Sequence, residues 1–201
     1  NRIAPAQVSV PLTWIDTSGE GSDAFDQPAG KSGKSFVNQR EAELIIDVVN
    51  QFELQTSFLD WLRNNKVSGE QPIGIITGYA PQRDLIRRKL QRAGISAELS
   101  EMVKVDTIDS YQGKQNLLVI LSLVRNNRKG PDGLVKEGFL SRPNRINVAM
   151  SRVMDRLVII GSKTGWRSGS AMDRVVTGFQ AEVERGTAHT IPSTEFREGT
   201  T

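Results

Sequence analysis

The chain has 201 residues, with 26 basic and 23 acidic side chains, a single histidine and no cysteine. This composition is typical of one soluble globular domain, and no apolar run approaches the roughly 20 residues that a membrane-spanning helix needs. The lack of cysteine excludes disulfides and thiolate metal sites, and one histidine argues against His-based metal binding or Ser–His catalysis. A net charge of +3 permits nucleic-acid binding without indicating it. We expect an intracellular protein without a membrane segment.

Apolar runs alternate with stretches of helical periodicity along the chain, which is typical of a mainly parallel α/β sheet flanked by helices. Strands are predicted at residues 10–16, 72–79, 103–108, 117–124 and 156–162. Helices are predicted at residues 38–52, 82–93, 144–153 and 171–184. Asn38 and Glu41 approach a capping box at the start of the first helix, and Gly94 suits the end of the second.

Two segments read as irregular. Residues 17–37 are rich in Gly, Ser and Asp and are expected to form a flexible loop. Residues 186–201 are expected to form a polar, poorly ordered tail, which leaves 1–185 as the folded domain. The chain begins with Asn1 rather than methionine, so we expect a piece of a longer protein.

The tripeptide Gly33-Lys34-Ser35 matches the end of a P-loop fingerprint. The first glycine of that fingerprint would have to occupy position 28, which is Pro28. No apolar strand leads into this segment, although a P-loop joins a buried strand to a helix. We therefore predict a basic surface loop here and no P-loop.

The predicted helix 144–153 carries Arg145 and Arg152 seven residues apart, on the same face, with a separate apolar stripe of Ile146, Ala149, Met150 and Val153. The planar fork of an arginine held on a packed helix suits the oxygens of a transferring phosphoryl group. From the spacing alone, two solvated surface arginines are the preferred interpretation.

Two longer stretches, “VDTIDSYQGKQNLLVILSLVRNN” (105–127) and “GFLSRPNRINVAMSRVMDRLVIIGS” (138–162), resemble motifs V and VI of superfamily 1 helicases. The resemblance is closest to the branch that holds the nonsense-mediated-decay helicase. “IGIITGYAPQRDLI” (73–86) resembles motif IV of that branch. Together with “PLTWIDTSG” (11–19) and “NQREAELI” (38–45), these segments extend the resemblance over residues 10–163.

The resemblance implies the second RecA-like domain of an ATP-dependent DNA or RNA helicase. Its fold would be the three-layer RecA-like P-loop-NTPase fold, here without its own P-loop. ATP and Mg²⁺ would be bound mainly by a first, N-terminal RecA-like domain, with the metal held there. This domain would close over the ATP and grip single-stranded nucleic acid, and alone it is expected to be inactive.

Residue by residue, the resemblance assigns Arg152 and Arg83 to the γ-phosphate as catalytic groups, with Arg152 as the motif VI finger. The other nucleotide contacts would be Gln112, Gly113, Lys114, Gln115 and Arg145. The nucleic-acid contacts would be Thr107, Ser110 and Tyr79. Position 115 departs from the family, which usually has glutamate where this chain has glutamine.

Three alternatives remain open from the sequence. The first is an independent enzyme with Lys34 as a P-loop lysine. The second is a Mg²⁺-dependent nuclease that uses Asp16, Asp106 and Asp109 near strand ends. The third is a non-catalytic module, derived from a helicase, that binds nucleic acid or protein.

Overall fold

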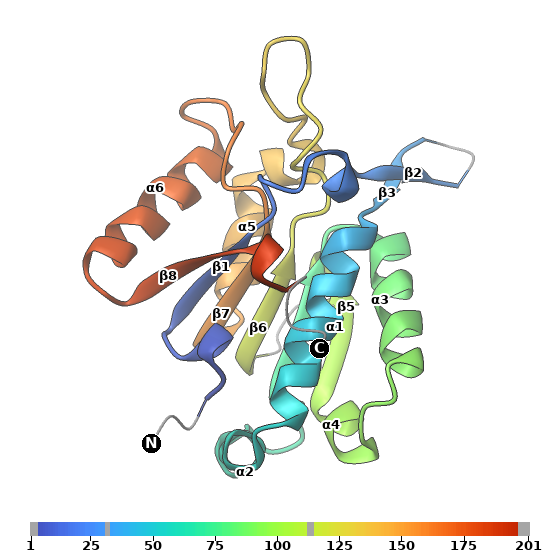
Figure 1. The fold of residues 1–201 in the computed structure, drawn as a ribbon, viewed down its shortest axis with the longest axis vertical. Helices are drawn as coiled ribbons and strands as arrows, with labels where there is room; N and C mark the ends of the chain where they lie inside the picture. The colour runs from blue at the N-terminus through green and yellow to red at the C-terminus, as the bar shows by residue number, and fades with distance from the viewer. Residues whose placement is uncertain (1–3, 31–32, 112–114, 197–201) are drawn as a thin grey trace.

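A computed structural model describes residues 4–30, 33–111 and 115–196 of the chain. Its centre is a six-stranded sheet in the order β5-β4-β6-β7-β1-β8, in which every neighbouring pair is parallel (Figure 1). The strands are β1 (Leu12–Asp16), β4 (Ile73–Thr77), β5 (Val103–Thr107), β6 (Asn116–Ser122), β7 (Val153–Gly161) and β8 (Ala188–Pro192).

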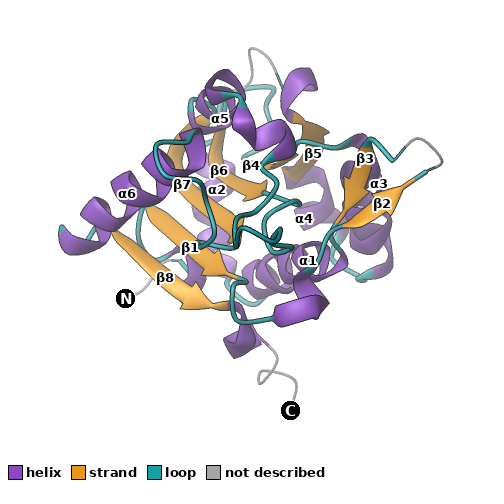
Figure 2. Ribbon diagram, turned by 90° about the horizontal axis from the view of Figure 1, so that it is seen from above, coloured by secondary structure: helices purple, strands orange, loops and turns teal. Residues whose placement is uncertain are grey.

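Helices cover both faces of the sheet and give the molecule three layers (Figure 2). The helices are α1 (Gln39–Glu53), α2 (Thr56–Asn65), α3 (Ala80–Arg92), α4 (Ala97–Met102), α5 (Pro143–Met150) and α6 (Ala171–Glu184). Buried residues of α1 to α4 form one apolar core with one face of the strands, and those of α5 and α6 form a second core on the other face.

The alternation of side chains along β6 explains both cores. Leu118 and Ile120 point into the core of α1 to α4, whereas Val119 and Leu121 point into the core of α5 and α6. A parallel strand that is covered on both faces reads as a continuous apolar run, and all seven residues of β6 are buried. The predicted three-layer, mainly parallel α/β fold is confirmed, as are the five predicted strands.

The start of α1 follows the predicted capping pattern. The Asn38 side chain accepts a hydrogen bond from the backbone N–H of Glu41 at 3.0 Å, which satisfies one of the unpaired donors of the first turn. Gly94 follows α3 with φ of +69°, the left-handed conformation that glycine adopts without strain.

The predicted polar tail is wrong for residues 186–196. Residues Ala188–Pro192 form β8, which extends the sheet beside β1, and Ser193–Phe196 form a 3-10 helix. Because β8 is an edge strand with only Ala188 buried, its sequence carries little apolar signal. Residues 197–201 of the predicted tail lie outside the described residues.

The segment predicted as a loop, 17–37, contains an antiparallel hairpin of β2 (Gln27–Ala29) and β3 (Ser35–Val37). The hairpin packs on the domain through Phe36, whose ring lies 5.8 Å from that of Tyr79, edge to face. Lys34 lies next to β3 in the connection between the two strands. Across the part of the chain that the structure covers, every helix is too short or too polar to cross a bilayer.

Candidate functional site

The connection between β5 and β6, residues 108–115, is the centre of the candidate site. Both strands run parallel to β4, so the chain must return from the carboxyl edge of the sheet to its amino edge within these residues. It starts with a 3-10 helix, Ile108–Ser110, and not with the α-helix usual in such crossovers. Tyr111, which follows this 3-10 helix, is completely buried. Its hydroxyl packs so closely on Gly74 of β4 that a Cβ built on this glycine would lie 2.4 Å from it. Tyr111 therefore fixes the connection to the sheet.

Three arginines from separate places in the chain border this connection. Arg83, in the first turn of α3, donates to Asp84 at 2.8 Å and lies 3.9 Å from Asp106. Arg145 of α5 donates to Asp109 at 3.2 Å.

The third arginine, Arg152, borders the far end of the same connection. Its carbonyl accepts the backbone N–H of Asn116 at 3.0 Å. Arg83 and Arg145 therefore lie at the start of the connection, at the carboxyl edge of the sheet, whereas Arg152 lies beside its other end, at the amino end of β6.

The prediction that Arg145 and Arg152 share a helix face is wrong. α5 ends at Met150, because the chain turns there to enter β7 at Val153. Ile146 and Ala149 are buried as predicted, but Met150 is 40% exposed and Val153 begins β7, so neither belongs to an apolar stripe of the helix.

The predicted nucleic-acid contacts divide into two groups. Thr107 and Ser110 lie together at the carboxyl end of β5, where the Thr107 hydroxyl donates to the Ser110 hydroxyl at 3.0 Å. Tyr79 follows β4 instead, and its ring packs 5.8 Å from Phe36 and 5.8 Å from Phe139. These aromatic neighbours favour a packing role for Tyr79 over the predicted contact with nucleic acid.

The predicted nucleotide contacts Gln112, Gly113 and Lys114 lie outside the described residues. Gln115 is exposed beside Asn116, at the amino end of β6. No contact described for Gln115 tests its predicted role.

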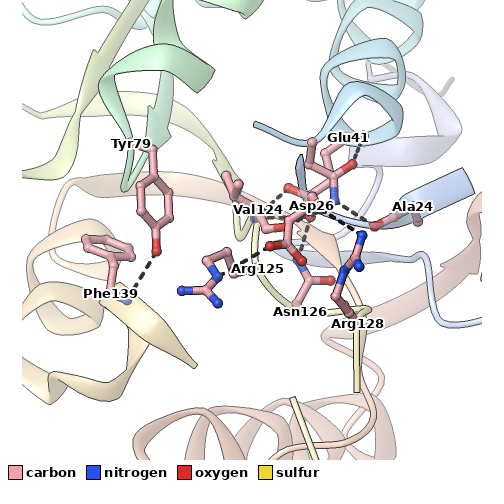
Figure 3. A network of polar contacts seen from close by, with 10 residues as sticks. Ala24, Asp26, Glu41, Tyr79, Val124, Arg125, Asn126, Arg128 and Phe139 are labelled. Carbon is pink, nitrogen blue, oxygen red and sulfur yellow. Dashed lines mark hydrogen bonds and ion pairs between the residues drawn. The ribbon is translucent and has the colours of Figure 1, made fainter. Parts of the chain in front are cut away.

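A buried polar network around Glu41 of α1 was not predicted from the sequence (Figure 3). Glu41 accepts hydrogen bonds from the Ser122 hydroxyl at 2.6 Å, the Val124 backbone N–H at 2.9 Å and the Asn126 side-chain amide. Burial raises the pKa of Glu41 to about 7, against the hydrogen bonds from Ser122 and Asn126, which lower it. The capping pattern at Asn38 singles out Glu41 in the sequence, but it gives no sign of these distant partners.

Residues 3–164 match a family model described as an AAA domain. The chain belongs to this AAA domain family. The relatives that the chain matches include proteins named as helicases and as regulators of nonsense transcripts. The predicted resemblance to superfamily 1 helicases of the nonsense-mediated-decay branch is thereby confirmed.

Three relatives illustrate this similarity. The helicase required for RNAi-mediated heterochromatin assembly 1 of Schizosaccharomyces pombe is 42% identical over 116 residues, which cover 57% of this chain and 11% of that protein. Regulator of nonsense transcripts 1 of Dictyostelium discoideum is 36% identical over 65% of this chain and 9% of that protein. The ATP-dependent helicase upf1 of S. pombe is 35% identical over 65% of this chain and 12% of that protein. This AAA domain spans about a tenth of the length of these relatives.

The arrangement of this AAA domain argues against two alternatives. Asp16 ends β1 and Asp106 lies in β5, with three strands between them in the sheet. At about 4.8 Å per strand spacing, β1 and β5 lie about 19 Å apart, so these carboxylates do not converge on one metal ion. Among the described residues, no group of three metal-ligating side chains gathers at one place. Lys34 precedes a hairpin strand and not a helix, so its segment lacks the geometry of a P-loop.

Proposed function

We propose that this AAA domain is the second RecA-like domain of an ATP-dependent helicase and closes over a nucleotide held mainly by a first RecA-like domain. One observation carries the proposal. Arg83, Arg145 and Arg152, from α3, α5 and the turn into β7, border a single loop that Tyr111 fixes to the sheet.

These arginines fit the phosphates of a nucleotide. A guanidinium presents parallel N–H groups that match phosphate oxygens as well as carboxylate oxygens. Arg83 and Arg145 now contact Asp84 and Asp109, two partly exposed carboxylates that phosphate oxygens could replace. When ATP is bound, it supplies the phosphoryl group that is transferred to water. The role of Arg152 would be to stabilise charge that develops on that group, a contribution of about 10³–10⁵ in rate.

The proposal assigns the Mg²⁺ ligands to the first RecA-like domain. The described part of this chain offers no cluster of carboxylates or histidines suited to the ion. On this view the chain alone binds nucleotide weakly and hydrolyses it negligibly. Its own contribution is to position arginines against the phosphates when the two domains close.

The proposal also includes contact with one strand of nucleic acid. The hydroxyls of Thr107 and Ser110 lie at the carboxyl edge of the sheet, beside the proposed nucleotide contacts. Hydroxyls bind backbone phosphates, and such contacts position a strand without reading its sequence. They therefore suit a motor that moves along DNA or RNA of any sequence.

Replacement of Arg152 tests the proposal directly. In the full-length protein, Arg152→Ala should lower ATP turnover by about 10³ or more, measured as phosphate release at saturating nucleic acid. Arg88→Ala, which removes an exposed arginine from α3, is the matched control and should leave the rate nearly unchanged. A near-normal rate for Arg152→Ala would contradict the proposal and favour a non-catalytic binding module. ATP turnover by the isolated chain that Lys34→Ala abolishes would also contradict the proposal, and would favour an independent enzyme with its own P-loop lysine.

A further inference from the structure

A basic pocket lies between the β2–β3 hairpin and the segment that follows β6. Its volume is about 280 Å³. Four cationic side chains and one carboxylate line it: Arg125, Arg128, Lys129, Lys136 and Asp26. Nothing in the motif resemblance assigns these residues a role. The excess of positive charge indicates an anionic ligand.

Arg125 is held firmly at the centre of this pocket. Its guanidinium lies 3.8 Å from the centre of the Phe36 ring, and its Nε lies 3.4 Å from the Asp26 carboxylate. Figure 3 shows Arg125 between Asp26 on one side and the pair of Tyr79 and Phe139 on the other. Stacking occupies the face of a guanidinium and leaves its N–H edge available for phosphate oxygens.

The other cations lie around Arg125 at the surface. Arg128 donates to the backbone carbonyl of Asp26 at 3.4 Å and its guanidinium lies 5.0 Å from the Phe25 ring. Lys129 and Lys136 are exposed, so their ammonium groups can meet a ligand from solvent. The side chain of Asp26 is only 7% exposed, so it faces Arg125 more than it faces a ligand.

The backbone that aims Arg125 is strained. Val124 has φ of +68°, a left-handed conformation that is an outlier for a β-branched residue. Both carboxylate oxygens of the buried Glu41 accept the Val124 N–H, at 2.9 and 3.1 Å, and hold this turn in place. Such strain, maintained by buried partners, is concentrated at functional sites. Buried groups of the fold therefore hold the turn that positions Arg125 in the pocket.

The pocket also lies at the carboxyl edge of the sheet, where Thr107 and Ser110 are proposed to contact nucleic acid. Thr107 ends β5, Tyr79 follows β4 and Val124 follows β6, and these three strands are neighbours in the sheet. The carboxyl ends of β5 and β6 are about two strand spacings, or 10 Å, apart. A single strand of nucleic acid that touches Thr107 and Ser110 can therefore reach Arg125 as well.

We propose that this pocket binds the phosphate backbone of single-stranded nucleic acid, independently of base sequence. Arg125 is its fixed element, and Lys129 and Lys136 add phosphate contacts at its rim. The inference rests on the proposed function, because it places the pocket on the path of the strand that the motor follows. Cationic side chains against backbone phosphates supply affinity that depends strongly on salt.

Salt-dependent binding tests the pocket. The full-length protein and its Lys129→Ala/Lys136→Ala variant are titrated with fluorescein-labelled oligo(dT) and oligo(U) over a series of KCl concentrations, with anisotropy as the readout. The loss of two phosphate contacts should reduce the slope of log K against log[salt] by about 1.4 for each oligonucleotide. At low salt the affinity should fall about tenfold or more.

The matched control is Arg88→Ala/Arg92→Ala, which removes the same charge from exposed residues of α3. Its slope should stay close to that of the wild type. A wild-type slope in the Lys129→Ala/Lys136→Ala variant overturns the pocket, even if the affinity falls. If the unmodified protein binds neither oligonucleotide, the proposed function fails together with the pocket. Far-UV circular dichroism confirms that the variants fold.

Discussion

The guanidinium of Arg145 lies 3.2 Å from the carboxylate of Asp109 and 5.1 Å from the centre of the Phe139 ring. Asp109 is 67% exposed, so the pair contributes little to stability. Its importance is positional, because a nucleotide phosphate would have to take the place of the Asp109 carboxylate at Arg145.

Asp109→Asn should therefore strengthen nucleotide binding. The amide keeps the shape of the side chain but no longer competes as an anion for Arg145. We expect KM for ATP to fall several-fold in the full-length protein, whereas Arg145→Ala should raise it, in steady-state assays of phosphate release. An unchanged KM in both variants would remove Arg145 from the nucleotide site.

The buried Glu41 should make stability depend on pH. Its pKa is about 7 in the folded protein and 4.5 in the unfolded chain, so the folded state binds the proton more tightly. The associated stability is present below pH 4.5 and is lost as the pH rises through 7. The free energy of unfolding should fall by about 3 kcal/mol over this range on account of this group.

Urea denaturation at pH 5 and pH 8 measures that change. Glu41→Gln, which is neutral at both values, should lack this part of the dependence. Glu43→Gln removes the same charge from an exposed position of α1 and should retain it. If the profiles of wild type and Glu41→Gln are parallel, Glu41 does not titrate in this range.

Two glycines should respond in opposite ways to alanine. A Cβ on Gly74 would lie 2.4 Å from the hydroxyl of Tyr111 and 2.6 Å from the side-chain oxygen of Asn116. Because both neighbours are buried, Gly74→Ala should destabilise the protein by about 1–3 kcal/mol.

Gly178 in α6 has open space at the same position, so Gly178→Ala should stabilise the protein by about 0.5–1 kcal/mol. Thermal unfolding of the two variants measures both signs. A neutral Gly74→Ala would show that the connection carrying Tyr111 can shift away from β4.

Removal of β8 should weaken the domain. Truncation after Gly186 removes the strand beside β1 and also the Ser193 carbonyl, which accepts a hydrogen bond from the buried Arg40 at 3.1 Å. Loss of an acceptor from a buried cation alone costs about 2 kcal/mol. Truncation after Phe196 keeps β8 and the following 3-10 helix and is the matched control, compared in the same urea titration. Equal stability of the two truncated chains would mean that β8 does not support the sheet.

The central strands could be predicted because their burial is written in their own residues. All residues of β4 and β6 are buried, and the centre of each strand is apolar: Ile75 and Ile76 in β4 and residues 117–121 in β6. The cap at Asn38 was equally local, since its partner Glu41 is three residues away. By contrast, β8 is half-exposed, and its place in the sheet depends on pairing with β1, more than 170 residues earlier in the chain.

Some residues of the candidate site could likewise be predicted from the sequence and others could not. The motif resemblance located Arg83, Arg145 and Arg152; the first two lie at the start of the connection between β5 and β6 and the third beside its end, while their roles stay predictions. The pocket around Arg125 could not be found in this way, because Phe36 and Asp26 reach it from a segment that reads as a loop. The strained conformation of Val124 could not be predicted from the sequence either, because a valine in an apolar run gives no indication of a positive φ.

The part of the connection that precedes the buried Tyr111 is short. Thr107 and Asp109 are separated by one residue, and the buried Tyr111 follows two residues later. Suppose that Arg145 releases Asp109 and binds a phosphate of ATP, while Thr107 binds single-stranded nucleic acid. Each of these two ligands then alters the backbone on which binding of the other depends. Thermodynamic linkage then requires the coupling to be equal in both directions. The factor by which ATP changes the affinity for the strand must be the factor by which the strand changes the affinity for ATP.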